Sequence, residues 1–394
     1  MLIIGLMSGT SIDGIDAALV EIKEKSPENL DVKVLNFMNK PYNKETRENI
    51  LECCDPNKGT VDKICRLNFQ LGEMLAQAAK EVVEEKGFNL KDVELIGSHG
   101  QTIYHDVGKD FVSSLQIGEA AIIAERTKIT TINNFRTRDI AAGGEGAPLV
   151  PYVDYILFKS DEYNRVMQNL GGIGNFTYLP KKAKLEDIKG TDTGPGNMLI
   201  DGVVHILTNG EKNFDRDGKI AKKGEISDEL LQKLYNHPFI TKDFPKTTGR
   251  EDFGLDYAQN IINIAKIMKL KDEDIVATVT YFTAYSVVDS YMRFIGENID
   301  QVIISGGGSY NPTLIFMIKD CIKKMINKEI SVMVLEDLGY SSDAKEAVAF
   351  AVLAYKTYKG QYNNVPQITG AKSYVTLGQI VPGNKNKNID KTVF

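Results

Sequence analysis

Two glycine-rich stretches decide the fold of this chain: Gly5-Leu6-Met7-Ser8-Gly9-Thr10-Ser11-Ile12-Asp13-Gly14-Ile15-Asp16 and Asn169-Leu170-Gly171-Gly172-Ile173-Gly174-Asn175-Phe176-Thr177. Each lies between short apolar runs, which predicts two strands joined by a glycine turn. Glycine lets backbone N–H groups approach an anion, and Thr10, Ser11 and Thr177 add hydroxyl donors. Two such hairpins could bind a polyphosphate from both sides, or they could be ordinary surface hairpins. The predicted phosphate-binding residues are Gly9, Thr10, Ser11, Ile12, Asp13, Gly14, Ile15, Asp16, Gly171 and Gly172.

The composition is that of an ordinary soluble globular protein. A length of 394 residues predicts two to three domain units, and a net charge of −6 gives no reason to expect nucleic acid or an anionic membrane as a partner. Four cysteines without a C-x-x-C pair or a Cys/His cluster argue against a zinc site and fit a reducing cytosol. The first residues read as a strand rather than a signal peptide, and no apolar run is long enough to cross a membrane. We therefore expect a cytoplasmic protein.

Strands and helices alternate along the chain, which predicts an α/β fold. Apolar periodicity predicts helices at 60–86, 119–126, 227–235, 255–268, 272–294 and 342–358, and strands at 93–96, 129–132, 301–305, 332–335 and 373–377. Because a hairpin followed by helices occurs twice, we expect two similar lobes with a cleft between them. The expected lobes are residues 1–132 with about 359–394, and residues 133–358.

Several familiar signatures are missing from the sequence. It has no GxxxxGK[ST] loop, no GxGxxG between a strand and a helix, and no GxSxG turn. This argues against a P-loop kinase, a Rossmann dehydrogenase and a serine hydrolase of the common type.

The segment Thr191-Asp192-Thr193-Gly194-Pro195-Gly196-Asn197 is the strongest chemical candidate. It places a carboxylate at a strand end, beside a glycine turn that opens a helix. Free N–H groups at the helix start, around Gly194 and Gly196, would favour a phosphate. Asp192 would then lie near the transferred phosphate, where a general base is needed. The alternative is that Asp192 only caps the helix.

Three further segments carry candidate ligand-binding residues. Gly306 and Gly307, after an apolar strand, could pack on an adenine face or could form only a tight turn. His99 and Gln101 follow another strand, where His99 could bind substrate or be a buried structural histidine. Arg136 and Arg138 precede a glycine loop and could bind a carboxylate or sugar hydroxyls, unless they are solvated charges on a mobile loop.

Glu346 lies in the first turns of the last long helix, among small and apolar residues. Such a carboxylate is either exposed at the helix start or directed into the cleft, and the sequence leaves both open.

At these residues the chain resembles the anhydro-N-acetylmuramic acid kinase family of the sugar kinase/Hsp70/actin superfamily. The resemblance extends from the first strand to the C-terminal part. The matching segments are 5–16, 97–105 (GSHGQTIYH), 134–151 (NFRTRDIAAGGEGAPLVP), 169–177, 190–201, 247–251 (TTGRE), 305–312, 346–354 (EAVAFAVLA), 364–366, 369–371 and 377–378. The resemblance implies a two-lobed, actin-like ATPase (ribonuclease H-like) fold of the α/β class, with mixed sheets and an interdomain cleft.

The resemblance also implies an activity. Water would attack the anomeric carbon of a 1,6-anhydro sugar, the bridge would open, and O6 would take the γ-phosphoryl group of ATP. The product would be N-acetylmuramic acid 6-phosphate, formed during peptidoglycan recycling. Asp192 is then the base, Gly9–Asp16 bind the ATP phosphates, and Glu346 is a magnesium or sugar ligand. Mg²⁺ is expected because phosphoryl transfer needs charge neutralisation, with Asp13 and Glu346 as its candidate ligands.

The expected partners are therefore ATP and a small sugar, and a homodimer is left open. Two alternatives remain at this stage. One is a kinase for another anhydro sugar, such as levoglucosan. The other is an actin- or Hsp70-like ATPase switch, which predicts a separate peptide-binding or polymer-forming module; we expect no room for one after the C-terminal helix.

Overall fold

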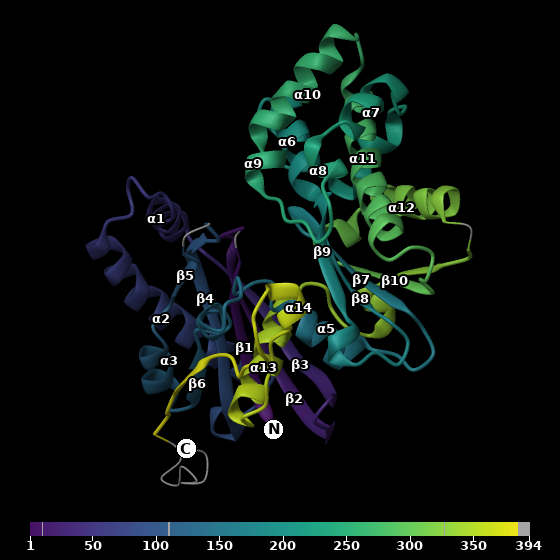
Figure 1. Ribbon diagram of the computed structural model, residues 1–394. Helices are drawn as coiled ribbons and strands as arrows, with labels where there is room; N and C mark the ends of the chain where they lie inside the picture. The colour runs from purple at the N-terminus through teal and green to yellow at the C-terminus, as the bar shows by residue number, and fades with distance from the viewer. Residues whose placement is uncertain (10, 109–110, 327, 385–394) are drawn as a thin grey trace. The chain divides into compact units, whose positions relative to one another are not determined.

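The computed structural model describes residues 1–9, 11–108, 111–326 and 328–384, so the predicted phosphate ligand Thr10 lies outside the described residues. The chain forms two compact units (Figure 1). The first unit contains residues 1–157 and the chain from 344 onward, and the second contains residues 158–343. The chain therefore leaves the first unit once and returns to it.

The first unit is built on a mixed sheet in the order β12-β6-β4-β1-β2-β3, with β5 paired to β4. Strands β1, β2 and β3 are antiparallel neighbours, whereas β4 runs parallel to β1 and β6 parallel to β4. The strands are β1 (Leu2–Ser8), β2 (Gly14–Ser26), β3 (Asn29–Pro41), β4 (Val93–Asp106), β5 (Ser113–Ile117), β6 (Thr130–Asn133) and β12 (Gln379–Val381).

Helices cover both faces of this sheet (Figure 1). Ile4 and Leu6 of β1 pack in a buried cluster with residues of α2, and the residue between them, Gly5, faces α13. This alternation follows from the period of two along a strand. The helices of the unit are α1 (Lys44–Cys54), α2 (Val61–Glu84), α3 (Ala120–Thr127), α4 (Thr137–Ala141), α5 (Val150–Phe158), α13 (Lys345–Tyr358) and α14 (Pro366–Thr369).

The second unit repeats the same strand order in a smaller sheet, β11-β10-β7-β8-β9. Again three consecutive strands are antiparallel, and the next two are parallel to the first of them. The strands are β7 (Arg165–Leu170), β8 (Ile173–Leu179), β9 (Lys189–Pro195), β10 (Gln301–Ser305) and β11 (Ser331–Val334). The repeat confirms the prediction of an α/β fold with two mixed sheets and two similar halves.

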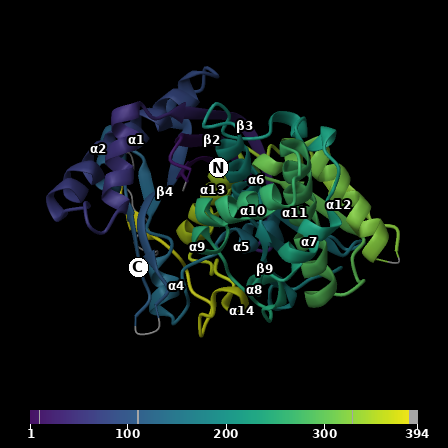
Figure 2. The same ribbon diagram turned by 90° about the horizontal axis from the view of Figure 1, so that it is seen from above.

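One face of the second sheet packs on a group of helices that lie side by side in Figure 2. Val166 and Leu170 of β7 and Val302 of β10 are buried against α6, α10, α11 and α12. The helices of the unit are α6 (Asn197–Leu207), α7 (Asp228–Tyr235), α8 (Pro238–Thr241), α9 (Arg250–Phe253), α10 (Leu255–Ile267), α11 (Asp272–Phe294) and α12 (Pro312–Met325).

Two sequence expectations differ from the structure. The strand predicted at 373–377 is wrong: Val375 and Leu377 donate their N–H groups to the side-chain oxygens of Asn364 and Asn363, and the strand is instead β12. The division between the units also falls elsewhere than expected. Residues 133–157 and helix α13 belong to the first unit, because α13 packs directly on its sheet.

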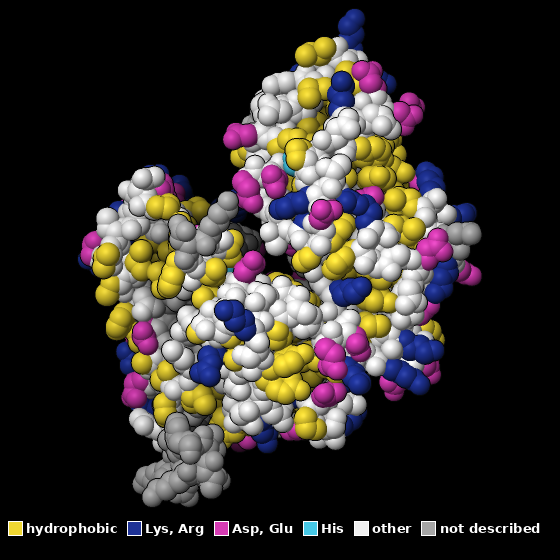
Figure 3. Space-filling model, viewed as in Figure 1, with side chains coloured by type: hydrophobic (Ala, Val, Ile, Leu, Met, Phe, Trp, Pro, Cys, Tyr) yellow, Lys and Arg dark blue, Asp and Glu magenta, His cyan; other side chains and the backbone are white. Residues whose placement is uncertain are grey.

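On the face drawn in Figure 3, basic and acidic side chains are intermixed. None of the helices in the described part of the chain combines the length and the apolar character that a bilayer crossing needs.

Candidate functional site

Hydrogen bonds fix the start of the first glycine turn. Ser8, the last residue of β1, is 1% exposed, and its hydroxyl donates to Oε1 of Gln101 at 2.6 Å. The phenol of Tyr42 lies 2.8 Å from the same hydroxyl and donates to it when the Ser8 proton is directed to Gln101. Burial raises the pKa of Tyr42 to about 12, so the phenol keeps its proton. Gln101, predicted to bind substrate, is 1% exposed and holds this turn in place.

The turn itself presents polar groups to solvent. Ile12 is 5% exposed and anchors the turn, and its N–H donates to the carbonyl oxygen of Gly9 at 3.2 Å. Ser11 and Asp13 are exposed and joined by a hydrogen bond of 2.8 Å. A side-chain carbon on Gly9 would meet no atom closer than 3.7 Å, which is ordinary van der Waals contact, so packing does not require glycine at this position.

Ile15 and Gly14, which also belong to the predicted phosphate-binding set, are constrained by packing. Ile15 is buried in the core of the unit, so its side chain cannot face a ligand. A side-chain carbon on Gly14 would lie 2.5 Å from the carbonyl oxygen of Lys40. Gly14 is therefore required for the close approach of β2 and β3.

Two buried glycines bring Glu346 to this turn. Side-chain carbons on Gly5 and Gly97 would lie 1.8 Å and 2.2 Å from carbonyl oxygens of α13, so only glycine lets that helix lie so close to the sheet. As a result Oε2 of Glu346, in the first turn of α13, reaches to 4.0 Å from the side-chain position of Gly9.

The charges around Glu346 suit a cation. Desolvation raises the pKa of its carboxyl, and the negative charges of Asp16 and Asp13 raise it further, although Lys345 and Arg136 oppose them. No group of three or more His, Cys, Asp or Glu side chains that could hold a metal was found among the described residues. Mg²⁺ in phosphoryl-transfer enzymes is usually held by one or two carboxylates together with phosphates and water, so Asp13 and Glu346 fit such an ion.

His99 is a buried structural residue. It is 4% exposed, packs on the ring of Phe350, and lies 2.9 Å through Nδ1 from the carbonyl oxygen of Gly100. Its Nε2 accepts hydrogen bonds from Arg136 at 2.9 and 3.2 Å. Burial, followed by the charge of Arg136, lowers the pKa of His99 to about 3, so the ring is neutral with Nδ1 protonated.

The loop that carries the two predicted arginines is held in place. Arg136 also donates to the carbonyl oxygen of Gly146 at 2.9 Å. Asp139, which the sequence analysis did not single out, is fully buried and accepts from the Gly146 N–H and the Asn364 amide. The alternative of a mobile, solvated loop therefore fails for Arg136, whereas the side chain of Arg138 is exposed.

In the second unit, Asp192 lies within β9 and does not cap a helix. Helix α6 begins after Gly196, which has no side chain to cap it. Oδ2 of Asp192 instead accepts a hydrogen bond of 3.0 Å from the backbone N–H of Thr248. Desolvation raises the pKa of Asp192 to about 6, with a further rise from Glu251 and opposing effects from the Thr248 N–H and Lys242.

The second glycine turn is hydrogen-bonded to the start of a helix. The N–H groups of Gly196, Asn197 and Met198 donate to the carbonyl oxygens of Gly171 and Gly172 at 2.8 to 3.0 Å. The prediction that the start of α6 offers free N–H groups to a phosphate is therefore wrong for these three.

Close packing also explains most of the other glycines in this unit. A side-chain carbon on Gly196 would lie 2.3 Å from the Gly171 oxygen, and Gly194 has a φ of +124° beside α11. A side-chain carbon on Gly306 or Gly308 would lie within 3 Å of Leu170, which favours the tight-turn alternative for these two glycines. Gly307 is exposed, Gly306 is half-buried and Gly308 is buried.

The comparisons with known proteins identify the family of this chain. The model of the family described as anhydro-N-acetylmuramic acid kinase matches residues 1–383. The chain belongs to this family. A family member from Caldanaerobacter subterraneus is 51% identical over 389 residues, with 96% of each chain covered. Another from Bacillus cereus is 47% identical over 385 residues, covering 96% of this chain and 99% of the relative.

Among solved structures, the chain is similar to the activator of 2-hydroxyisocaproyl-CoA dehydratase from Clostridium difficile, with 13% identity and a TM-score of 0.44. That similarity covers 90% of this chain and 95% of the other.

Proposed function

We propose that this chain is an ATP-dependent kinase that opens the anhydro ring of 1,6-anhydro-N-acetylmuramic acid and phosphorylates O6. The products are N-acetylmuramic acid 6-phosphate and ADP, as expected for peptidoglycan recycling. The observation that carries this proposal is the family match over residues 1–383. The position of Asp192 supports it, because the carboxylate is held in place and has a pKa suited to a base.

Asp192 is the proposed general base. It would take a proton from water as the oxygen attacks C1 of the sugar. The bond between C1 and the bridge oxygen breaks, that oxygen stays on C6, and it attacks the γ-phosphorus of ATP. A base works best when its pKa lies near the working pH, and burial brings Asp192 to about 6.

The first glycine turn is the proposed phosphate site. Gly9, Ser11 and Asp13 lie in its open, solvent-facing part, and Glu346 approaches from α13. Asp13 and Glu346 would hold Mg²⁺, which would neutralise charge on the β- and γ-phosphates. Exposed Gly307 is the proposed adenine contact.

Arg138 is the proposed contact for the sugar's carboxylate, because its guanidinium is exposed and such pairs form strong hydrogen bonds. His99, Gln101 and Arg136 would support the site through the hydrogen bonds described above.

The test is the reaction in ¹⁸O-labelled water, with ADP release measured with and without sugar. We expect ADP release to depend on the anhydro sugar, with label at C1 and none in the phosphate, provided the product is analysed before the anomeric oxygen exchanges. Label in the phosphate would mean direct hydrolysis of ATP and would favour an ATPase. Faster turnover of levoglucosan, or of ring-open N-acetylmuramic acid, would overturn the substrate assignment.

A further inference from the structure

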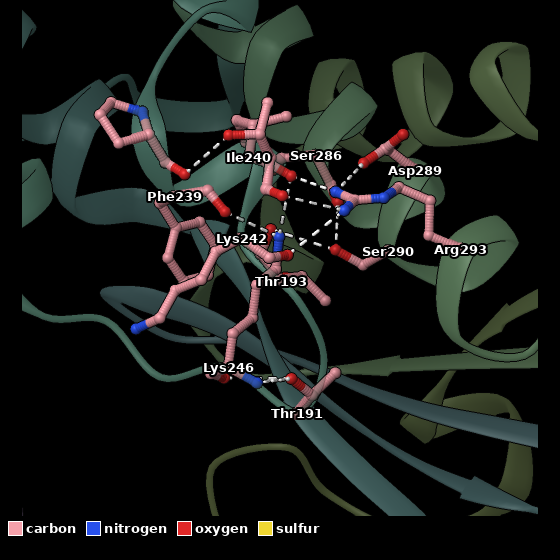
Figure 4. Close-up of polar contacts among 12 residues, drawn as sticks. Thr191, Thr193, Phe239, Ile240, Lys242, Lys246, Ser286, Asp289, Ser290 and Arg293 are labelled. Atoms are coloured by element: carbon pink, nitrogen blue, oxygen red, sulfur yellow. Dashed lines mark hydrogen bonds and ion pairs between the residues drawn. The ribbon is translucent and has the colours of Figure 1, made fainter.

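A buried lysine lies next to the proposed base in the second unit. Lys246 is 2% exposed, and its Nζ donates to the carbonyl oxygens of Phe239 and Ile240 at 3.0 and 3.3 Å (Figure 4). Both carbonyls belong to the short helix α8, and the Phe239 oxygen also accepts the Lys242 N–H at 3.3 Å. The ammonium group therefore binds α8 to the segment that leads to Thr248.

The surroundings of this ammonium group keep it in one place. It lies 4.2 Å from the ring centre of Phe239 and 4.5 Å from that of Phe244, within the range of cation–π attraction. Arg293 of α11 donates to the Ile240 carbonyl oxygen as well and lies 3.5 Å from Asp289. These contacts connect α8 and its following loop to α11 (Figure 4).

The backbone of Lys246 is bound to the strand that carries the proposed base. Its N–H donates to Oγ1 of Thr191 at 2.9 Å, and its carbonyl oxygen accepts the Asp192 N–H at 3.0 Å. Two residues further on, the Thr248 N–H donates to the Asp192 carboxylate at 3.0 Å. The position of that last donor therefore depends on how firmly Lys246 is held.

We propose that Lys246 is a positioning residue for the reaction: its buried ammonium group fixes the segment 246–248 on β9, so that the Thr248 N–H orients the carboxylate of Asp192. This inference rests on the proposed role of Asp192 as the base. Lys246 itself touches neither substrate nor nucleotide in this scheme. The effect is transmitted through the backbone rather than through the charge of Lys246.

The charged groups around the two residues set the expected pH behaviour. Lys242 and Glu251 act on Asp192, and Lys242, Asp289 and Arg293 act on Lys246. Lys246 is not among the charges that act on Asp192. The Thr248 N–H lowers the pKa of Asp192, so losing that hydrogen bond must raise it.

The first test replaces Lys246 with methionine. Because misplacement of a reacting group by 1 Å can cost about 10²-fold, we expect kcat to fall about 10-fold or more, with KM for ATP changed less than about twofold. The acid limb of the rate profile should move to higher pH. Lys266→Met, in an exposed part of α10, is the matched control and should leave both rate and profile unchanged.

A second pair of variants changes the structure less, so the proposal can still be tested if Lys246→Met fails to fold. Thr191→Val removes the hydroxyl that binds the Lys246 N–H, and Thr191→Ser keeps it. The valine variant should shift the acid limb in the same direction as Lys246→Met, and the serine variant should restore it. Equal profiles for the valine and serine variants would overturn the proposal.

A titration separates this proposal from the role of Asp192 in catalysis. The Asp192 carboxyl is followed by NMR in protein labelled with ¹³C at aspartate, assigned with Asp192→Asn. We expect its pKa to rise in Lys246→Met and Thr191→Val. An unchanged titration in both variants would refute the positioning role. A shifted titration together with full activity in Asp192→Asn would uphold the positioning but refute Asp192 as the base.

Discussion

The two units share one strand order, yet they use their glycine turns differently. In the first unit Ser11 and Asp13 of the turn after β1 are exposed, and a side-chain carbon on Gly9 would meet no atom closer than 3.7 Å. In the second unit the carbonyl oxygens of Gly171 and Gly172, in the turn after β7, accept three N–H groups from the start of α6. The second turn therefore holds the start of a helix, whereas the first does not.

The cause of the difference is the element that follows the third strand. In the second unit β9 bends at Gly194 to Gly196, so that α6 begins against the hairpin turn. In the first unit β3 runs on to Pro41, and the next helix, α1, is capped locally by the side chain of Asn43. The N–H groups of α1 are thus not bound to the first turn, and the backbone donor that this segment supplies to the turn is the Tyr42 N–H, which binds the Asp13 oxygen at 2.9 Å.

The largest expected effect is that of replacing Asp192, the proposed base in the second unit. Asp192→Asn keeps the shape and the Thr248 hydrogen bond but removes basicity, so turnover should fall by at least about 10²-fold. Affinity for ATP, measured by calorimetry, should stay nearly constant, because the proposed phosphate turn belongs to the first unit. A variant that retains more than about a third of the wild-type rate would remove Asp192 from the role of general base, for which losses of 10²-fold or more are typical.

Substitution of Gly196, where α6 meets the second glycine turn, should reduce the stability of the protein. A side-chain carbon on Gly196 would lie 2.3 Å from the Gly171 oxygen, so Gly196→Ala should reduce the free energy of unfolding by about 1–3 kcal/mol. Gly171→Ala is the control, because the same carbon there would meet nothing closer than 3.5 Å. Equal denaturation midpoints for the two variants would contradict the assignment of a packing role to Gly196.

Substitution of Gly9 in the first glycine turn should instead weaken the binding of ATP. Gly9→Val adds a branched side chain, whose first carbon would meet no atom closer than 3.7 Å, beside the turn where the proposed phosphates lie, and should weaken ATP binding at least about tenfold, or about 1.4 kcal/mol. Its thermal midpoint should stay close to that of the wild type. Unchanged ATP affinity in a folded Gly9→Val protein would show that phosphate binds elsewhere.

The smallest expected effect is a change of the rate with pH. We expect Asp192 of the second unit to titrate and His99 of the first unit not to. Asp192 must be deprotonated to act as a base, so kcat/KM should fall to about half of its plateau near pH 6 and decrease further below it. His99 should add no inflection near its ordinary pKa, because burial lowers it to about 3 and the ring stays neutral. A second inflection near pH 6.5 that disappears in His99→Asn would contradict the structural role of His99.

Much of the fold could be predicted from local patterns. The apolar period of α2, the glycine hairpins and the strand before Gly306 each reflect nearby residues, and the predicted boundaries lie close to the observed ones. The residues 373–377 were mistaken for a strand because their partners are the side chains of Asn363 and Asn364.

The candidate site was less accessible from sequence because its key contacts join distant segments. Asp139 binds residues 7 and 225 positions away, and Thr248 lies 56 positions from Asp192. No local pattern encodes these pairs. Thr248 lies in the TTGRE segment, which is part of the family resemblance. Nothing in that segment indicates that Thr248 binds Asp192.

The segment 246–248 also affects how the second sheet meets other molecules. Strand β9 is an edge of that sheet, and an uncovered edge offers backbone groups with which a strand of another chain can pair. The Lys246 carbonyl occupies the Asp192 N–H, so part of this edge is already paired within the chain. The same few residues that hold the carboxylate therefore also occupy one backbone donor of this edge strand.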